Sequence, residues 1–106
     1  LPATDLRAAA DSAAADLESI GDRIAARSPA RAISYIEELR RRCAHIAEFP
    51  NAGPPRPQWG EGIRIVIHGP YLVVHRVTGD TVQILRVVHG ARDLNQIFED
   101  DPPSVK

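Results

Sequence analysis

The chain has 106 residues, of which 43% are hydrophobic and 25% charged, proportions close to those of an average soluble globular domain. This length fits one domain and leaves no room for a second folded unit of ordinary size. Thirteen Lys and Arg residues face fourteen Asp and Glu residues, and the resulting net charge of −1 argues against a bulk nucleic-acid binder.

The sequence also bears on the cellular compartment. No apolar stretch approaches the length of a membrane span, so we expect no transmembrane helix. The first residues contain no basic region followed by a long apolar stretch, so we expect no signal peptide. The single cysteine, Cys43, cannot form an internal disulfide. Together these features predict a cytoplasmic protein.

The first half of the sequence has the periodicity of two helices. The first has apolar residues at spacings of four, three and four, which places them on one helical face: Ala13, Leu17, Ile20 and Ile24. Ser28-Pro29 then supplies a capping residue followed by proline at a first helical position. The second helix has its own apolar stripe: Ala32, Ile36, Leu39, Cys43 and Ile46. Because so few residues separate the helices, we expect an antiparallel pair with a shared core.

The second half has the pattern of strands. Residues 50–60 contain four prolines and predict an ordered, extended crossover. The β-branched segments 62–68, 71–77 and 81–88 are separated by short turns and predict three antiparallel strands. Residues 91–98 predict a short terminal helix, and residues 99–106 a frayed tail.

Motifs of common enzymes are missing from the sequence. There is no glycine-rich phosphate loop, no serine nucleophile elbow and no paired-carboxylate signature. The four histidines are dispersed, so we expect structural or surface histidines rather than metal ligands, and no cofactor. Cys43 lies in a helical apolar stripe, where a buried, inert thiol is the usual outcome.

Arginine supplies twelve of the thirteen basic residues. On a helix, the run 40–42 points in three directions and predicts a solvated face. Four further arginines lie within or directly after the apolar strands: Arg64, Arg76, Arg86 and Arg92. Buried arginine is costly unless it is paired. These side chains either grip phosphate or an acidic peptide, or pair with Glu61, Asp93 or a partner chain, and the spacing does not choose between the two.

Several motifs follow one another in a set order: Ala15-Asp16-Leu17-x-x-Ile20, Pro29-x-x-Ala32-x-x-Tyr35-Ile36-x-x-Leu39, Phe49-Pro50-x-x-Gly53, Gly62-Ile63-Arg64, Tyr71-Leu72-Val73-Val74-His75-Arg76-Val77 and Ile84-Leu85-Arg86-Val87-Val88-His89-Gly90-Ala91-Arg92-Asp93-Leu94. In order and spacing the chain closely resembles the ParE branch of the ParE/RelE toxins of bacterial type II toxin–antitoxin modules. The resemblance covers roughly residues 5–98, and its closing segment is the most specific part.

The resemblance implies an α+β fold. Its parts are an N-terminal strand at residues 4–9, an antiparallel αα-hairpin, a three-stranded antiparallel meander that joins one twisted sheet, and a short C-terminal helix. The strand at residues 4–9 is assigned from the resemblance, against the helix propensity of an alanine-rich segment. A single ParE-like domain would then span residues 1–106, with its core at 4–98.

One departure from such toxins concerns the first helix. Gly21 stands where toxins of this type commonly carry a bulky aromatic residue. Glycine inside a helix costs about 1 kcal/mol relative to alanine. We therefore expect a smaller core residue and a looser helix at this point.

The resemblance also implies partners. ParE-like toxins poison DNA gyrase, RelE-like toxins cut mRNA in the ribosomal A site, and both are neutralised by a cognate antitoxin. We therefore expect a ParD-like antitoxin in a toxin–antitoxin hetero-oligomer, no membrane partner, and no sequence-specific DNA binding by this chain alone. The antitoxin should cross the helical hairpin and the sheet edge, and contact Ile33, Tyr35 and Ile36.

The residues favour the gyrase-directed activity. RNA cleavage needs acid–base help and charge stabilisation at the phosphate. Arg64 and Arg92 match two basic positions of the nucleases, but their clustered lysines are absent, and Phe98 stands about where a tyrosine hydroxyl is expected. We therefore favour a non-enzymatic gyrase poison that binds its target through Arg64, Arg86, His89, Arg92, Leu94 and Phe98. The alternatives are a ribosome-dependent mRNA endonuclease that uses Arg64, His89 and Arg92, or an inactive member that only binds antitoxin.

Overall fold

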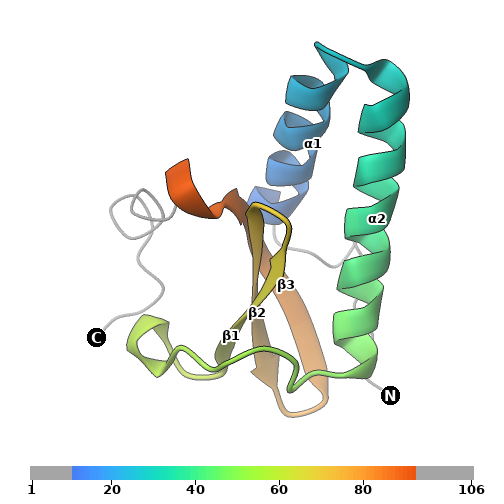
Figure 1. Ribbon diagram of the computed structural model, residues 1–106. Helices are drawn as coiled ribbons and strands as arrows, with labels where there is room; N and C mark the ends of the chain where they lie inside the picture. Colours follow the sequence, from blue (N-terminus) through green and yellow to red (C-terminus); the bar gives the residue numbers. More distant parts are fainter. Residues whose placement is uncertain (1–10, 93–106) are drawn as a thin grey trace.

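The chain folds as a helical hairpin against a small antiparallel sheet. The computed structural model describes residues 11–92. Helices α1 (Asp11–Ala25) and α2 (Pro29–Glu48) precede a 3₁₀ turn, η2 (Pro57–Trp59), and strands β1 (Ile63–His68), β2 (Tyr71–Thr78) and β3 (Thr81–His89). Figure 1 shows the two helices side by side, with the sheet next to them. This arrangement confirms the predicted α+β fold.

Two predicted elements fall wholly or partly beyond the described range. The strand expected at residues 4–9 lies outside it. Residues 90–92 are helical, and the remainder of the predicted terminal helix lies outside the described residues. None of the described helices is long and apolar enough to cross a membrane.

The helical hairpin forms as its sequence predicts. The Ser28 side chain accepts a hydrogen bond from the Arg31 backbone N–H at 3.1 Å, and Pro29 opens α2. The predicted stripes meet in one core cluster, which includes Leu17, Ile20, Leu39, Cys43 and Ile46. Burial raises the pKa of the Cys43 thiol to about 11, so the thiol stays protonated and inert at neutral pH.

The sheet has the order β1-β2-β3, and all of its pairings are antiparallel. Alternation places three cross-strand rows on the side that faces the helices: Arg64–His75–Ile84, Val66–Val73–Val87 and His68–Tyr71–His89. The middle row packs with the helical stripes in the core cluster. The polar and aromatic side chains of these rows therefore flank the aliphatic middle row, except that the first row ends in the aliphatic Ile84, which also belongs to the core cluster.

The opposite face of the sheet is also apolar. Trp59 of η2 packs there with Ile63, Ile65 and Val74 in a second cluster. The crossover before β1 is ordered, as predicted, and includes one isolated bridge between Pro55 and Arg64. The crossover thus brings Trp59 onto a face of the sheet that the helices do not cover.

A β-bulge interrupts the pairing of β2 with β3. Val74 pairs with Arg86 while His75 pairs with Ile84, which leaves Leu85 as an extra residue on β3. A bulge changes the side-chain alternation of its strand. As a result Ile84 and Val87 both join the helix-facing core, whereas Leu85 packs against the second cluster.

A salt bridge fixes α1 to β3. The Arg86 guanidinium donates hydrogen bonds to both carboxylate oxygens of Asp16, at 2.8 and 3.1 Å. The Val87 backbone N–H also donates to Asp16 Oδ2, at 2.9 Å. One carboxylate on α1 therefore satisfies three donors of the last strand.

Candidate functional site

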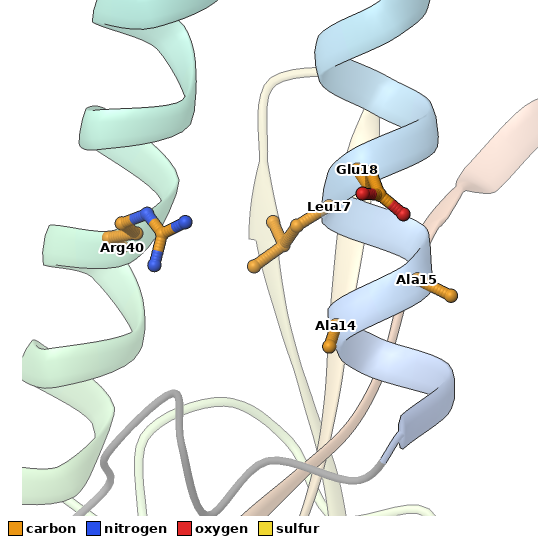
Figure 2. A pocket seen from close by; sticks show the side chains of 5 residues that line it. All are labelled: Ala14, Ala15, Leu17, Glu18 and Arg40. Carbon is orange, nitrogen blue, oxygen red and sulfur yellow. The ribbon is translucent and has the colours of Figure 1, made fainter.

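A surface groove with both apolar and charged side chains lies between the two helices. One cavity of about 420 Å³ is lined by Ala14, Ala15, Leu17, Glu18 and Arg40, and Figure 2 shows Arg40 reaching from α2 towards α1. A second cavity of about 360 Å³ is lined by Gly21, Ala32, Ile33, Ile36, Glu37 and Arg40. Because Arg40 lines both cavities, we treat them as one surface and call it the hairpin groove.

The structure brings together two of the three residues predicted to contact the antitoxin. Ile33 is 65% exposed, and the half-buried Ile36 lines the same groove. Tyr35 lies elsewhere: its ring centroid is 5.7 Å from that of His68 and 6.0 Å from that of Tyr71. Tyr35 therefore faces the end of the sheet, while the two isoleucines form an exposed apolar patch.

Gly21 helps to shape the hairpin groove. A Cβ atom at this position would lie 3.4 Å from Cγ1 of Ile36, so the missing side chain leaves space beside that isoleucine. The predicted small residue is thus at the groove and not in the buried core.

We expect Gly21→Ala to raise the free energy of unfolding by up to about 1 kcal/mol, because alanine is the better helix former. Urea denaturation followed by circular dichroism measures this change. The new methyl group also narrows the hairpin groove beside Ile36. A lower free energy of unfolding would show that the Ile36 side chain cannot move away from the new methyl group, which would lie 3.4 Å from its Cγ1 atom.

Three of the strand arginines bind groups of their own chain. Arg64 Nη1 donates to the carbonyls of Asn51 at 3.0 Å and Gly53 at 2.6 Å. Arg76 Nε donates to the Glu61 carbonyl at 3.3 Å. Together with the bridge between Arg86 and Asp16, these contacts favour internal pairing over free guanidinium groups.

Two of the residues expected at a nuclease site, Arg64 and His89, lie apart in the sheet. Arg64 lies in the row of His75, whereas His89 lies in the row of Tyr71, which is four positions before His75 in β2. Four residues of a strand span about 13 Å. Arg92 is exposed after β3, and His89 is half-buried with its ring edge against Tyr71 at 5.5 Å. Leu94 and Phe98, also predicted at the target surface, lie outside the described residues.

His75 is a buried polar residue that sequence patterns do not single out. Its side chain is fully buried, and neither ring nitrogen has a hydrogen-bond partner. Burial lowers the pKa of His75, and the positive charge of Arg64 acts in the same direction. Backbone groups of Pro50 and Val73 lie near the ring and act to raise the pKa of His75, but neither forms a well-aligned hydrogen bond with a ring nitrogen. His75 is therefore held neutral beneath the crossover.

This burial predicts a pH dependence of stability. The unfolded chain takes up a proton on His75 near pH 6.5, whereas the folded chain resists it. The contribution of His75 is fully present above pH 6.5 and is lost as the pH falls towards the lowered pKa of the folded state. We expect His75→Leu to flatten the decrease in unfolding free energy between pH 7 and pH 5, measured by urea denaturation. An equal decrease in both proteins would contradict this assignment.

Comparisons with known proteins identify the family. The family model for the ParE toxin of the type II toxin–antitoxin system parDE matches residues 9–94. The chain belongs to this ParE family. A solved structure, described as the chromosomal ParDE TA system from P. aeruginosa, is similar to it at 28% sequence identity and a TM-score of 0.65. That match covers 76% of this chain and 89% of the other. No curated protein matches the chain.

Family membership makes this chain a ParE toxin of a type II toxin–antitoxin system and confirms the resemblance seen in its motifs. Among residues 11–92, no group of three or more His, Cys, Asp or Glu side chains could hold a metal ion. In the same range, the hairpin groove is open at the surface and Arg92 is exposed beyond β3.

Proposed function

We propose that this ParE toxin inhibits growth by binding DNA gyrase in the cytoplasm, and that a ParD-like antitoxin neutralises it. The family match over residues 9–94 carries the proposal. The separation of Arg64 from His89 supports a role in binding over phosphodiester cleavage, because a nuclease needs its acid, base and phosphate-binding groups around one phosphate.

The hairpin groove is the proposed site for a helix of the antitoxin. Amphipathic helices dock in grooves through apolar side chains at helical spacing. Ile33 and Ile36 offer such a contact, and Glu37 and Arg40 flank it with charges of both signs. A partner helix with a central apolar stripe and charged borders fits this pattern.

Ile33→Asp should weaken ParD binding at least about tenfold, because it places a charge in the apolar contact. Titration calorimetry with purified ParD measures the affinity. Ala44→Asp is the matched control, since it adds the same charge at an exposed position of α2 outside the groove. Equal affinities of the two variants would contradict the proposed site.

A cleavage assay with gyrase, ATP and supercoiled plasmid tests the proposed target. We expect protein-linked linear DNA that appears only when gyrase is present and disappears when ParD is added. Arg92→Ala should reduce these breaks, whereas Arg41→Ala, an equal loss of charge on the exposed side of α2, should not. A folded, growth-inhibiting chain that yields no breaks would exclude gyrase as the target.

Two further assays would identify the alternative functions. Cleavage of mRNA on primed ribosomes would identify a RelE-like endonuclease. A chain that binds ParD but leaves growth unaffected would be an inactive member whose retained role is antitoxin binding.

A further inference from the structure

The first part of the crossover is attached to the sheet through one strand. This segment, residues 50–56, leaves the end of α2 and passes beside the sheet towards η2 (Figure 1), and we call it the crossover arm. The Arg56 backbone N–H donates to the Ile63 carbonyl at 2.8 Å, and the Ile65 N–H donates to the Pro54 carbonyl at 3.2 Å. Backbone hydrogen bonds therefore join the end of the arm to the start of β1.

The Arg64 side chain adds a second link between the arm and β1. Its guanidinium donates to the carbonyls of Asn51 and Gly53. The backbone and side-chain bonds of the arm thus end on residues 63–65 of β1. Because α2 and the pairing of β2 with β3 take no part in these bonds, the arm can open while those elements stay intact.

His75 lies directly opposite Arg64 in the sheet, at the point that the arm covers. The backbone of Pro50, the first residue of the arm, lies near its ring. The ring is fully buried, and neither nitrogen has a hydrogen-bond partner among residues 11–92. The β-bulge falls at the same place, because the register with β3 shifts between Val74 and His75. A buried ring that can take up a proton, an interrupted strand ladder and the arm therefore meet at one point.

A proton on His75 has no favourable place while the arm is closed. Arg64 is the charged side chain that faces the ring, and its positive charge opposes protonation. The Pro50 backbone near the ring is not aligned to accept a hydrogen bond from it. A second buried positive charge is costly without an acidic partner, and contact with water relieves that cost.

The neighbouring elements supply no acid to pair with His75. Its partner on β3 is the uncharged Ile84. Residues 50–55 of the arm carry no ionisable side chain, and Arg56 donates to the Pro55 carbonyl. The ionisable groups of the helices nearest this face are already paired, protonated or exposed: Asp16, Cys43, His45 and Glu48.

We propose that the crossover arm is a proton-operated latch: protonation of His75 releases residues 50–56 from β1 while the helical hairpin and the three strands stay folded. Opening admits water to the ring. It also removes the carbonyls that hold Arg64, whose side chain then turns into solvent and away from the new charge. The acid form of the toxin therefore exposes backbone groups of Ile63 and Ile65 that the arm covers at neutral pH.

The composition of the arm favours a local opening over global unfolding. Pro50, Pro54 and Pro55 fix φ at three of its positions, so the segment moves as a stiff unit. Ala52 packs against the main core cluster, whereas Asn51 is exposed. Opening the arm breaks few contacts and uncovers little apolar surface, which is typical of segments that open before the rest of a protein unfolds.

Native-state amide exchange of the full chain, measured by NMR as protection factors, tests the latch. The Arg56 and Ile65 amides report on the arm, and the Leu39 amide within α2 reports on global unfolding. We expect the two arm amides to be less protected than Leu39 at both pH 7.5 and pH 5.5. Their protection factors should fall by about tenfold between these pH values, the factor expected when the open form alone takes up one proton near pH 6.5.

Two substitutions at His75 remove the proton without removing the arm. In His75→Leu and in His75→Gln, the protection factors of Arg56 and Ile65 should be the same at both pH values. His45→Gln is the matched control, because His45 is an exposed histidine on α2, shortly before the arm. The tenfold fall should persist in that variant.

Three outcomes would overturn the proposal. Arm amides that are less protected than Leu39 but equally protected at both pH values would show that the arm opens without uncovering His75. Arm amides as protected as Leu39 would show that water reaches His75 only through global unfolding. A tenfold fall that survives in both His75 variants, or that disappears in His45→Gln, would assign the proton to another group.

Discussion

Gly53→Ala is expected to lower the free energy of unfolding by more than about 3 kcal/mol. Gly53 has a φ of +78°, a conformation that side chains with a Cβ rarely adopt. A Cβ atom here would also overlap the backbone carbonyl of Ile65, which has no freedom to move because it belongs to β1. The crossover would have to lift, and the hydrogen bond from Arg64 to the Gly53 carbonyl would be lost.

Thermal and urea denaturation followed by circular dichroism measure the loss. Gly79→Ala separates backbone strain from overlap, because Gly79 has a φ of +58° and no atom within 4 Å of its potential Cβ. We expect Gly79→Ala to lower the free energy of unfolding by only about 1–2 kcal/mol. Equal losses in the two variants would show that the crossover yields to the new methyl group without penalty.

Asp16→Ala is expected to lower the free energy of unfolding by about 2–3 kcal/mol. The Asp16 and Arg86 side chains are only 15% and 27% exposed, so solvent screens their interaction less than that of a surface pair. The substitution also removes the acceptor of the Val87 N–H. Buried or half-buried donors that lose their acceptor account for most of the expected loss.

Asp22→Ala is the matched control, because Asp22 is an exposed aspartate on the same helix. A double-mutant cycle with Arg86→Ala then isolates the coupling between the two side chains. If the losses in unfolding free energy of Asp16→Ala and Arg86→Ala simply add in the double variant, the two side chains are not coupled. Asp16 would then stabilise the fold through the Val87 N–H or through helix α1, and not through the Arg86 guanidinium.

The local parts of the fold were predictable from the sequence. Spacings of three and four residues place Leu17, Ile20, Leu39 and Ile46 on the buried faces of their helices, and the structure confirms this. Ser28-Pro29 predicts the start of α2 because capping depends on neighbouring residues. The three strands follow from β-branched segments and short turns. Each of these signals lies within a few residues of the element that it specifies.

The long-range parts were not predictable. The second apolar cluster depends on Trp59 folding back against Val74. The extra residue Leu85 depends on which partner each β3 residue finds, and not on the alternation of β3 itself. The partner of Arg86 is 70 residues away, and Glu61 supplies a carbonyl rather than the expected carboxylate. Backbone carbonyls, such as those that bind Arg64, have no signature in the sequence.

The candidate surfaces were likewise predictable only in part. The resemblance led to Ile33 and Ile36, and the structure places both at the hairpin groove. It did not separate them from Tyr35, because the packing of that ring depends on His68 and Tyr71 from the sheet. Their role in antitoxin binding stays a prediction, as does the role of Arg92 at the target.

The contact between Asp16 and Arg86 also sets the order of events during synthesis. Its two side chains are 70 residues apart in the chain, and a ribosome that adds 5–20 residues per second needs about 4–14 s to make that interval. Throughout this time α1 lacks the strand that fixes it, so its apolar stripe cannot yet pack against β3. The complete toxin surface therefore forms only after β3 has been translated, so a polypeptide released before Arg86 is not yet a folded toxin.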